Sequence, residues 1–102
     1  MIKKLKLRLL AEAAADYYDV PIEKLRSKCR KAIYTRPRHI CQFIAADAGV
    51  KQAVIAYFWK VDHASVIYGC RMVAERIAND QAEADELKRF MEYAKKQINV
   101  KR

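Results

Sequence analysis

Residues 51–77, KQAVIAYFWKVDHASVIYGCRMVAERI, contain two helical segments separated by a short link. We expect the first, about 50–58, to contribute Val54, Ile55 and Phe58 to a core. A tight link at 59–61 precedes Asp62, a residue type that favours the N-cap of a helix. In the second helix, apolar residues recur at helical spacing and the others face away: the core stripe is Val66, Cys70, Val73 and Ile77, and the outward set is Ala64, Tyr68, Arg71 and Glu75. This pattern over 50–78 predicts a helix-turn-helix.

The rest of the chain has the same helical periodicity and almost no strand signals. The predicted fold is therefore all-α, a compact bundle of about six helices. The other four helices are expected at about 2–17 (in an N-terminal unit of 1–18), 21–27, 33–47 and 80–98. Gly49 follows the third of these ranges and suits its C-terminal end.

Helical spacing also predicts which side chains face the core. The first helix has a stripe of Ile2, Leu5, Leu9 and Ala13. The third should bury an apolar stripe and turn a polar pair outward: the stripe is Ile33, Ile40 and Ile44, and the pair is Arg38 and Gln42. The last is expected to bury Leu87, Met91, Ala94 and Ile98. At its start, Asp80 and Glu83 have the spacing of a capping box.

Length and composition limit the possible classes of protein. At 102 residues the chain has room for one domain, 1–102. Its two glycines exclude a Gly-rich phosphate loop, and its three widely spaced cysteines predict reduced thiols instead of disulfides or a metal site. No apolar run is long enough for a signal peptide or a membrane span, which predicts a soluble intracellular protein. Neighbouring residues on a helix splay about 100° apart, so Asp62, His63 and Ser65 cannot form a catalytic triad, and we expect no enzyme activity and no cofactor.

The positive charge of the chain is concentrated in one segment. The whole chain carries +9, and Lys24–Arg38 holds seven basic residues and no acidic one. A solvated helix face normally mixes charges of both signs to limit self-repulsion. The segment therefore favours a phosphate-binding surface.

Several motifs together resemble one known family. Asp62-His63-Ala64-Ser65-Val66 is similar to the Asp-His-Thr-Thr-Val signature of the C-terminal DNA-binding domain of the bacterial replication initiator DnaA, a Trp-repressor-like helix-turn-helix. Upstream stretches resemble the Tyr-Tyr, Ser-Lys-Arg-Arg and Ala-Arg-Pro-Arg stretches of that domain, in the same order: they are Tyr17-Tyr18, Ser27-Lys28-Cys29-Arg30 and Thr35-Arg36-Pro37-Arg38. The resemblance covers essentially the whole chain.

The resemblance implies a set of DNA-contacting residues. Arg30 matches an arginine that enters the minor groove, where narrow A·T-rich tracts concentrate negative potential. Arg38 matches a DNA-contacting arginine, and Asp62 and His63 match residues that read bases in the major groove. With the phosphate contacts expected around Arg30, the full predicted set is Lys28, Arg30, Lys31, Arg36, Arg38, His39, Lys60, Asp62, His63, Ala64, Ser65 and Tyr68.

The chain also departs from the family pattern. His39 stands where the family commonly has glutamine, and Ala64 and Ser65 replace two threonines. Trp59-Lys60-Val61 replaces Gly-Gly-Arg, and Cys29 replaces an arginine of the basic loop. We therefore expect duplex binding to persist with an altered preference for sequence. There is no room in 102 residues for an ATPase domain, so ATP-driven initiation is not expected.

The sequence predicts sequence-preferring double-stranded DNA binding by a stand-alone initiator-type domain, in control of replication initiation or transcription. We expect a cytoplasmic, nucleoid-associated protein of bacterial or phage origin, with DNA as its partner, a replication initiator or other protein as a further partner, and no small-molecule substrate. Two alternatives stay open. A helical adaptor would bind an acidic protein through its basic face, and a membrane-surface binder would use the basic residues at 2–10.

Overall fold

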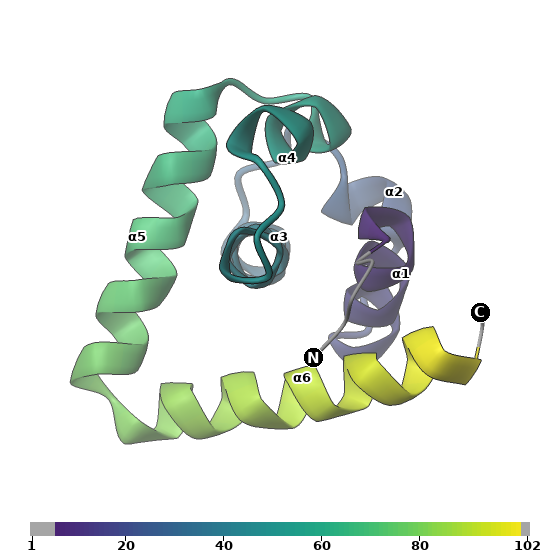
Figure 1. Cartoon of the computed structure of the whole chain (residues 1–102), viewed down its shortest axis with the longest axis vertical. Helices are drawn as coiled ribbons and strands as arrows, with labels where there is room; N and C mark the ends of the chain where they lie inside the picture. Colours follow the sequence, from purple (N-terminus) through teal and green to yellow (C-terminus); the bar gives the residue numbers. More distant parts are fainter. Residues whose placement is uncertain (1–5, 101–102) are drawn as a thin grey trace.

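Helix α3 lies at the centre of the fold, and the other helices surround it. The structure, a computed structural model, describes residues 6–100, the last of them by its backbone alone. Within this range it contains no strand and six helices: α1 Leu7–Tyr17, α2 Ile22–Leu25, α3 Ala32–Asp47, α4 Gln52–Trp59, α5 His63–Asn79 and α6 Gln81–Val100. Figure 1 views α3 end-on, with α4 above it, α5 on the left, α6 below and α1 on the right. The predicted all-α bundle is confirmed.

The core is one cluster that receives side chains from all six helices. Its largest fully buried members include Phe90 of α6, Leu10 of α1, Leu25 of α2 and Ile55 of α4. Burying apolar side chains of this size contributes about 1.5–3 kcal/mol each to folding. This cluster therefore fixes the short helices α2 and α4, which are too short to be stable alone.

The predicted faces of α5 and α6 are confirmed. Val66 and Val73 of α5 are buried, while Ala64, Tyr68, Arg71 and Glu75 are exposed. In α6, Leu87, Ala94 and Ile98 are buried and Met91 is half-buried. Trp59 is also buried, at the end of α4. Ile2 and Leu5 of the predicted first stripe lie outside the described residues.

The predicted orientation of α3 is confirmed only in part: Ile44 is buried and Ile40 packs half-buried against the core, but the other three residues are not placed as predicted. Ile33 is 60% exposed, whereas Arg38 and Gln42 are 8% and 2% exposed. Residues 31–33 are all exposed, so the first turn of α3 lies outside the packed part of the fold. Arg38 can be buried because backbone carbonyls accept hydrogen bonds from its guanidinium. Val54 of α4 is half exposed and not in the core.

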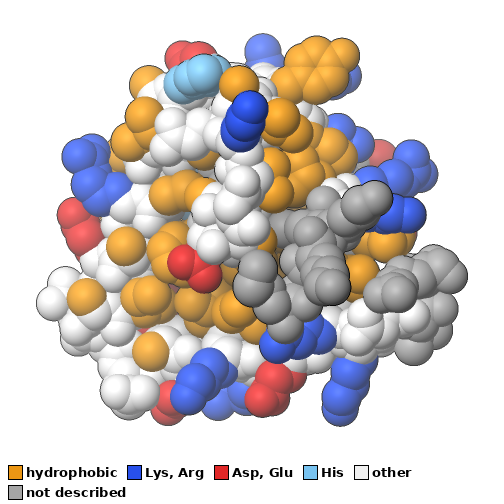
Figure 2. Space-filling view, viewed as in Figure 1, with side chains coloured by type: hydrophobic (Ala, Val, Ile, Leu, Met, Phe, Trp, Pro, Cys, Tyr) orange, Lys and Arg blue, Asp and Glu red, His pale blue; other side chains and the backbone are white. Residues whose placement is uncertain are grey.

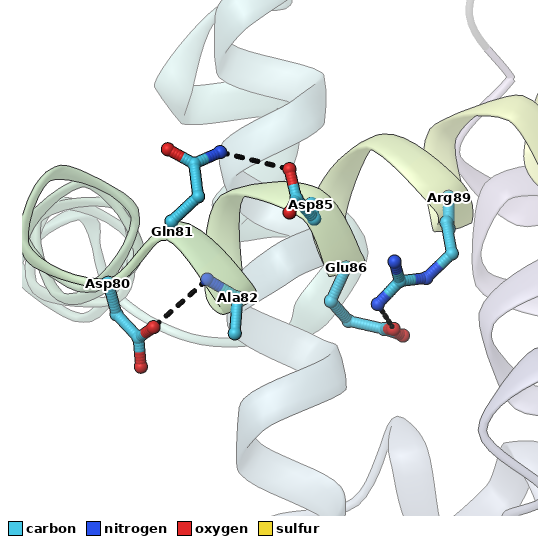
Figure 3. A network of polar contacts seen from close by, with 6 residues as sticks. All are labelled: Asp80, Gln81, Ala82, Asp85, Glu86 and Arg89. Carbon is cyan, nitrogen blue, oxygen red and sulfur yellow. Dashed lines mark hydrogen bonds and ion pairs between the residues drawn. The ribbon is translucent and has the colours of Figure 1, made fainter.

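Asp80 caps α6, but the predicted capping box is not formed. The Asp80 carboxylate accepts a hydrogen bond from the Ala82 amide at 3.0 Å (Figure 3). The Glu83 carboxylate lies instead 3.3 Å from Arg76 and 3.7 Å from Arg36. Two other side-chain hydrogen bonds join residues within α6: Gln81 donates to Asp85, and Arg89 donates to Glu86 (Figure 3). Glu83 therefore links α6 to α5 and α3 instead of capping its own helix.

The two glycines meet different structural requirements. Gly49 follows the C-cap of α3 with φ +95°, a conformation that side chains with a Cβ disfavour. Gly69 lies where α5 crosses α3, and a Cβ built there would be 2.7 Å from the His39 ring and 2.9 Å from Oε1 of Gln42. Gly69 therefore allows the two helices to pack closely.

No helix in the described residues is long and apolar enough to cross a membrane.

Candidate nucleic-acid interface

One concave surface joins the basic loop, α3 and the α4–α5 link. This surface, the recognition groove, encloses about 990 Å³. It is lined by Ser27, Lys28, Arg30, Thr35, Arg38, His39, Gln42, Lys60, Val61, Asp62, Ala64, Ser65 and Tyr68. Segments about 30 residues apart in the sequence thus share one surface.

The first part of the basic loop at 27–31 is held by side-chain hydrogen bonds. The Ser27 hydroxyl donates to the Lys24 carbonyl at 2.7 Å and accepts from the Cys29 amide at 3.1 Å, which turns the chain as it leaves α2. From α3, the Arg38 guanidinium donates to carbonyls of Leu25 at 2.7 Å and of Cys29 and Lys24 at 3.2 Å. Burial lowers the pKa of Arg38. The loop therefore presents exposed cations from a fixed backbone.

The link between α4 and α5 makes a tight turn without glycine. Lys60 follows α4 with φ 57° and ψ 46°, the left-handed conformation that a glycine would adopt without strain. The next amide, of Val61, donates to the Ala56 carbonyl at 3.0 Å and closes the end of α4. The helix-turn-helix is therefore retained although Lys60 stands where a glycine was expected.

Asp62 caps α5 as predicted. Its Oδ1 accepts a hydrogen bond from the Ser65 amide at 2.8 Å. This bond lowers the pKa of the Asp62 carboxyl, so the group is ionised at neutral pH. The exposed carboxylate has lone pairs for further donors, so capping and base reading are compatible.

The floor of the groove is formed where α3 meets α5. The His39 ring packs edge-on against Tyr68, with ring centroids 6.1 Å apart. Gln42 is buried beside it, and its Oε1 has no hydrogen-bond partner among the described residues. Burial, together with the nearby charges of Arg76 and Arg38, lowers the pKa of His39. The imidazole at the groove floor is therefore neutral at pH 7.

The structure brings together nine of the twelve predicted contact residues in this groove. Lys31, Arg36 and His63 do not line it. Lys31 and His63 are exposed neighbours of groove residues in the sequence. Arg36 was expected beside Arg30, but it lines a different cavity and lies 3.7 Å from Glu83. The predicted contacts with DNA stay predictions for all twelve.

Sequence reasoning missed four residues of the groove, namely Ser27, Thr35, Gln42 and Val61. Thr35, His39 and Gln42 follow the spacing i, i+4, i+7, which places them on one face of α3. That spacing was a usable signal, but of these three residues only Gln42 was assigned to a face, the outward one with Arg38. Among the described residues, no group of three His, Cys, Asp or Glu side chains could hold a metal ion, and all three cysteines are free thiols.

The fold and the groove define a helix-turn-helix protein with a basic loop beside its second helix. Comparison with known families agrees: a family described as bacterial DnaA protein helix-turn-helix matches residues 8–73, more than half of the chain. The chain belongs to this family of DNA-binding domains.

Curated relatives match most of this chain but only a small part of their own length. The chromosomal replication initiator protein DnaA of Aromatoleum aromaticum is 29% identical over 86 residues, which cover 81% of this chain and 18% of that protein. The protein of the same name from Azoarcus sp. is 27% identical, over 81% of this chain and 18% of that protein. The one from Treponema denticola is 26% identical, over 76% of this chain and 17% of that protein. The chain thus spans about a fifth of the length of these relatives.

The lowered pKa of His39 predicts a pH-dependent stability. As pH falls from about 7.5 to 5, the unfolded chain binds a proton at this residue near the ordinary histidine pKa of about 6.5, and the folded chain does so only at lower pH. The free energy of unfolding should therefore fall over this range, until the pH is below the lowered pKa. Urea unfolding at several pH values measures the slope. His39→Gln should flatten it, and equal slopes in wild type and His39→Gln would contradict the assignment.

Proposed function

We propose that this chain binds double-stranded DNA with a preference for sequence, through the recognition groove. Arg30 enters the minor groove, and the start of α5 reads the adjacent major groove. One observation carries the proposal: Arg30 of the basic loop and Asp62, Ala64 and Ser65 of the second helix line the same concavity.

The first turn of α5 has the properties of a base-reading helix start. Ala64 and Ser65 are short and exposed, so the backbone can approach base edges closely. Ser65 supplies a hydroxyl for a hydrogen bond, and the Ala64 methyl suits a thymine methyl group. His63, exposed at the tip of the helix, adds a ring nitrogen that can donate to a purine. Discrimination between bases is therefore expected from these four positions, 62 to 65.

The cations around the groove supply affinity without sequence preference. Lys28, Arg30 and Lys31 of the loop and Lys60 of the link are exposed, and three of these four line the groove. Each phosphate that such a cation neutralises releases counterions and steepens the salt dependence of binding. The groove thus separates positioning contacts from base-reading contacts, as duplex-binding proteins generally do.

The relatives suggest the process that this binding serves. They are named chromosomal replication initiator proteins, and we place this chain in the control of replication initiation or of transcription at initiator-type sites. Helix α6 lies beyond the matched residues 8–73 but contributes Phe90 and Ala94 to the common core. The proposed binding domain therefore includes α6.

Selection of bound sites from a random duplex pool, followed by titration of the selected duplex at several salt concentrations, tests the function. We expect an enriched site with an A·T-rich segment, and log Kd rising with log salt at about 0.9 per phosphate contact. Ser65→Ala and His63→Ala should reduce the preference for the selected site by roughly five- to a hundredfold, about 1–3 kcal/mol per base contact. Val54→Ser, in an exposed position outside the groove, is the control and should retain it.

A pool without enrichment would refute base reading, and an absence of duplex binding would favour the adaptor interpretation. Equal site preference in Ser65→Ala, His63→Ala and wild type would move base reading away from the start of α5.

A further inference from the structure

Helix α4 is apolar around its whole circumference, yet only one side of it is buried. Residues 53–59 are seven consecutive apolar residues. Ile55, Ala56 and Trp59 are buried in the core, but Val54 is 50% exposed and Tyr57 is 87% exposed. A helix that is apolar on all sides is ordinarily covered on all sides. Within residues 6–100, the outer face of α4 therefore lacks the partner that its composition indicates.

A hollow of about 570 Å³ lies beside this face. It is lined mainly by apolar side chains, including Leu7 of α1 and Val54, Tyr57 and Phe58 of α4, and its two charged residues are both cations, Arg26 and Lys60. In the orientation of Figure 1, Figure 2 shows hydrophobic side chains and Lys or Arg side chains together at the surface above α4. We call this surface the α4 patch.

The patch is preorganised. The Arg26 guanidinium lies 4.0 Å from the centre of the Phe58 ring and donates a hydrogen bond to the Phe58 carbonyl at 2.8 Å. These two contacts hold the cation and the aromatic floor in one arrangement before any partner binds. Tyrosine, with few rotatable bonds, also loses little entropy when it is covered. Binding at this site therefore requires little reorganisation.

We propose that the α4 patch docks an acidic amphipathic helix of another protein. Its apolar side chains would fill the hollow and cover Tyr57, and its carboxylates would pair with Arg26 and Lys60. A second copy of this chain fits less well, because Arg26 and Lys60 would face the same cations in a chain that carries +9. A flat lipid surface fits less well because it leaves the hollow of about 570 Å³ unfilled, whereas a helix can insert a side chain into it.

This inference does not depend on DNA binding. Apart from Lys60 and Val61, which line both hollows, the patch shares no lining residue with the recognition groove. The two sites are therefore separable by substitution.

Display selection with a library of random 16-residue peptides tests the proposal. The full wild-type chain is the only target of the selection, and the Tyr57→Ser variant, matched except for the patch, is used afterwards to measure the binding of the enriched peptides. We expect enriched peptides with apolar anchors at i, i+3 or i+4, and i+7 and with a net negative charge. Tyr57→Ser should weaken their binding at least tenfold, and Ile33→Ser, which changes another exposed apolar residue, should leave it unchanged within twofold. Thermal melting of each variant checks that it folds.

Four outcomes would overturn the proposal. A selection that enriches nothing, or enriches neutral or basic peptides, removes the acidic helix as the occupant. Enriched peptides that bind Tyr57→Ser as tightly as wild type place the contact elsewhere. Tyr57-dependent binding to anionic vesicles with no peptide enrichment would assign the patch to a membrane, and Tyr57-dependent self-association in ultracentrifugation would assign it to a second copy.

Discussion

Replacing Arg38 by methionine should destabilise the fold by about 3 kcal/mol and release the basic loop. The guanidinium is buried and donates to three carbonyls, two at the C-terminal end of α2 and one in the loop. Methionine fills a similar volume but leaves these carbonyls without their donors. Since a helix C-terminus carries partial negative charge, the loss of a cation there adds to the cost.

The two effects are measured separately. Urea unfolding gives the loss of stability, and hydrogen exchange or trypsin cleavage at residues 28–31 gives the opening of the loop. Arg38→Lys is the informative comparison, because an ammonium keeps the charge but cannot donate along all the directions of the guanidinium. We expect Arg38→Lys to lie between wild type and Arg38→Met in both measurements. Loop protection equal to that of wild type in Arg38→Met would show that Arg38 does not position the loop.

The helices were largely predictable from the sequence because their signals are local. Asp62 has an N-cap side chain at the correct spacing, and its bond to the Ser65 amide needs nothing from the rest of the fold. Val66 and Val73 mark the buried face of a long helix, where periodicity is most informative. Gly49 likewise ends α3 through its own conformational freedom.

The orientation of α3 was not predictable in this way. Its spacing predicts an apolar face with Ile33, Ile40 and Ile44 and a polar face with Arg38 and Gln42, yet the fold buries Ile44 together with both polar residues. Hydrophobicity favours the first face, but the carbonyls that satisfy Arg38 come from α2 and the loop. Long-range hydrogen bonds of this kind have no signal in the sequence of the helix itself.

Only part of the candidate site was predictable from the sequence, again because tertiary contacts have no local signal. The charge run from Lys24 to Arg38 includes the loop that borders the groove, but charge alone does not show which cations are already engaged. Arg26 lies over Phe58, Arg36 approaches Glu83 and Arg38 is buried, whereas Lys28, Arg30 and Lys31 are exposed. Only the tertiary structure divides this run into residues that hold the fold and residues that face solvent.

Among the exposed cations, Arg30 should contribute most to DNA affinity. It lines the recognition groove, and the residue before it, Cys29, is tied to α3 through its carbonyl. An arginine presented from a fixed loop can enter a narrow minor groove, where the negative potential is strongest, at little entropic cost. We expect Arg30→Ala to weaken binding to the selected duplex by roughly 10- to 100-fold, about 1.4–2.7 kcal/mol, as measured by fluorescence anisotropy.

Lys95→Ala is the matched control for net charge. It removes the same unit of charge from the exposed surface of α6, on the side of the molecule opposite α4 (Figure 1). At 0.15 M salt, charges farther apart than about 8 Å are largely screened, so this change should cost less than twofold. Arg30→Lys keeps the charge but loses the planar donor, and an intermediate affinity is expected. Equal losses in Arg30→Ala and Lys95→Ala would mean that only net charge attracts the duplex, and the groove would then not be the contact surface.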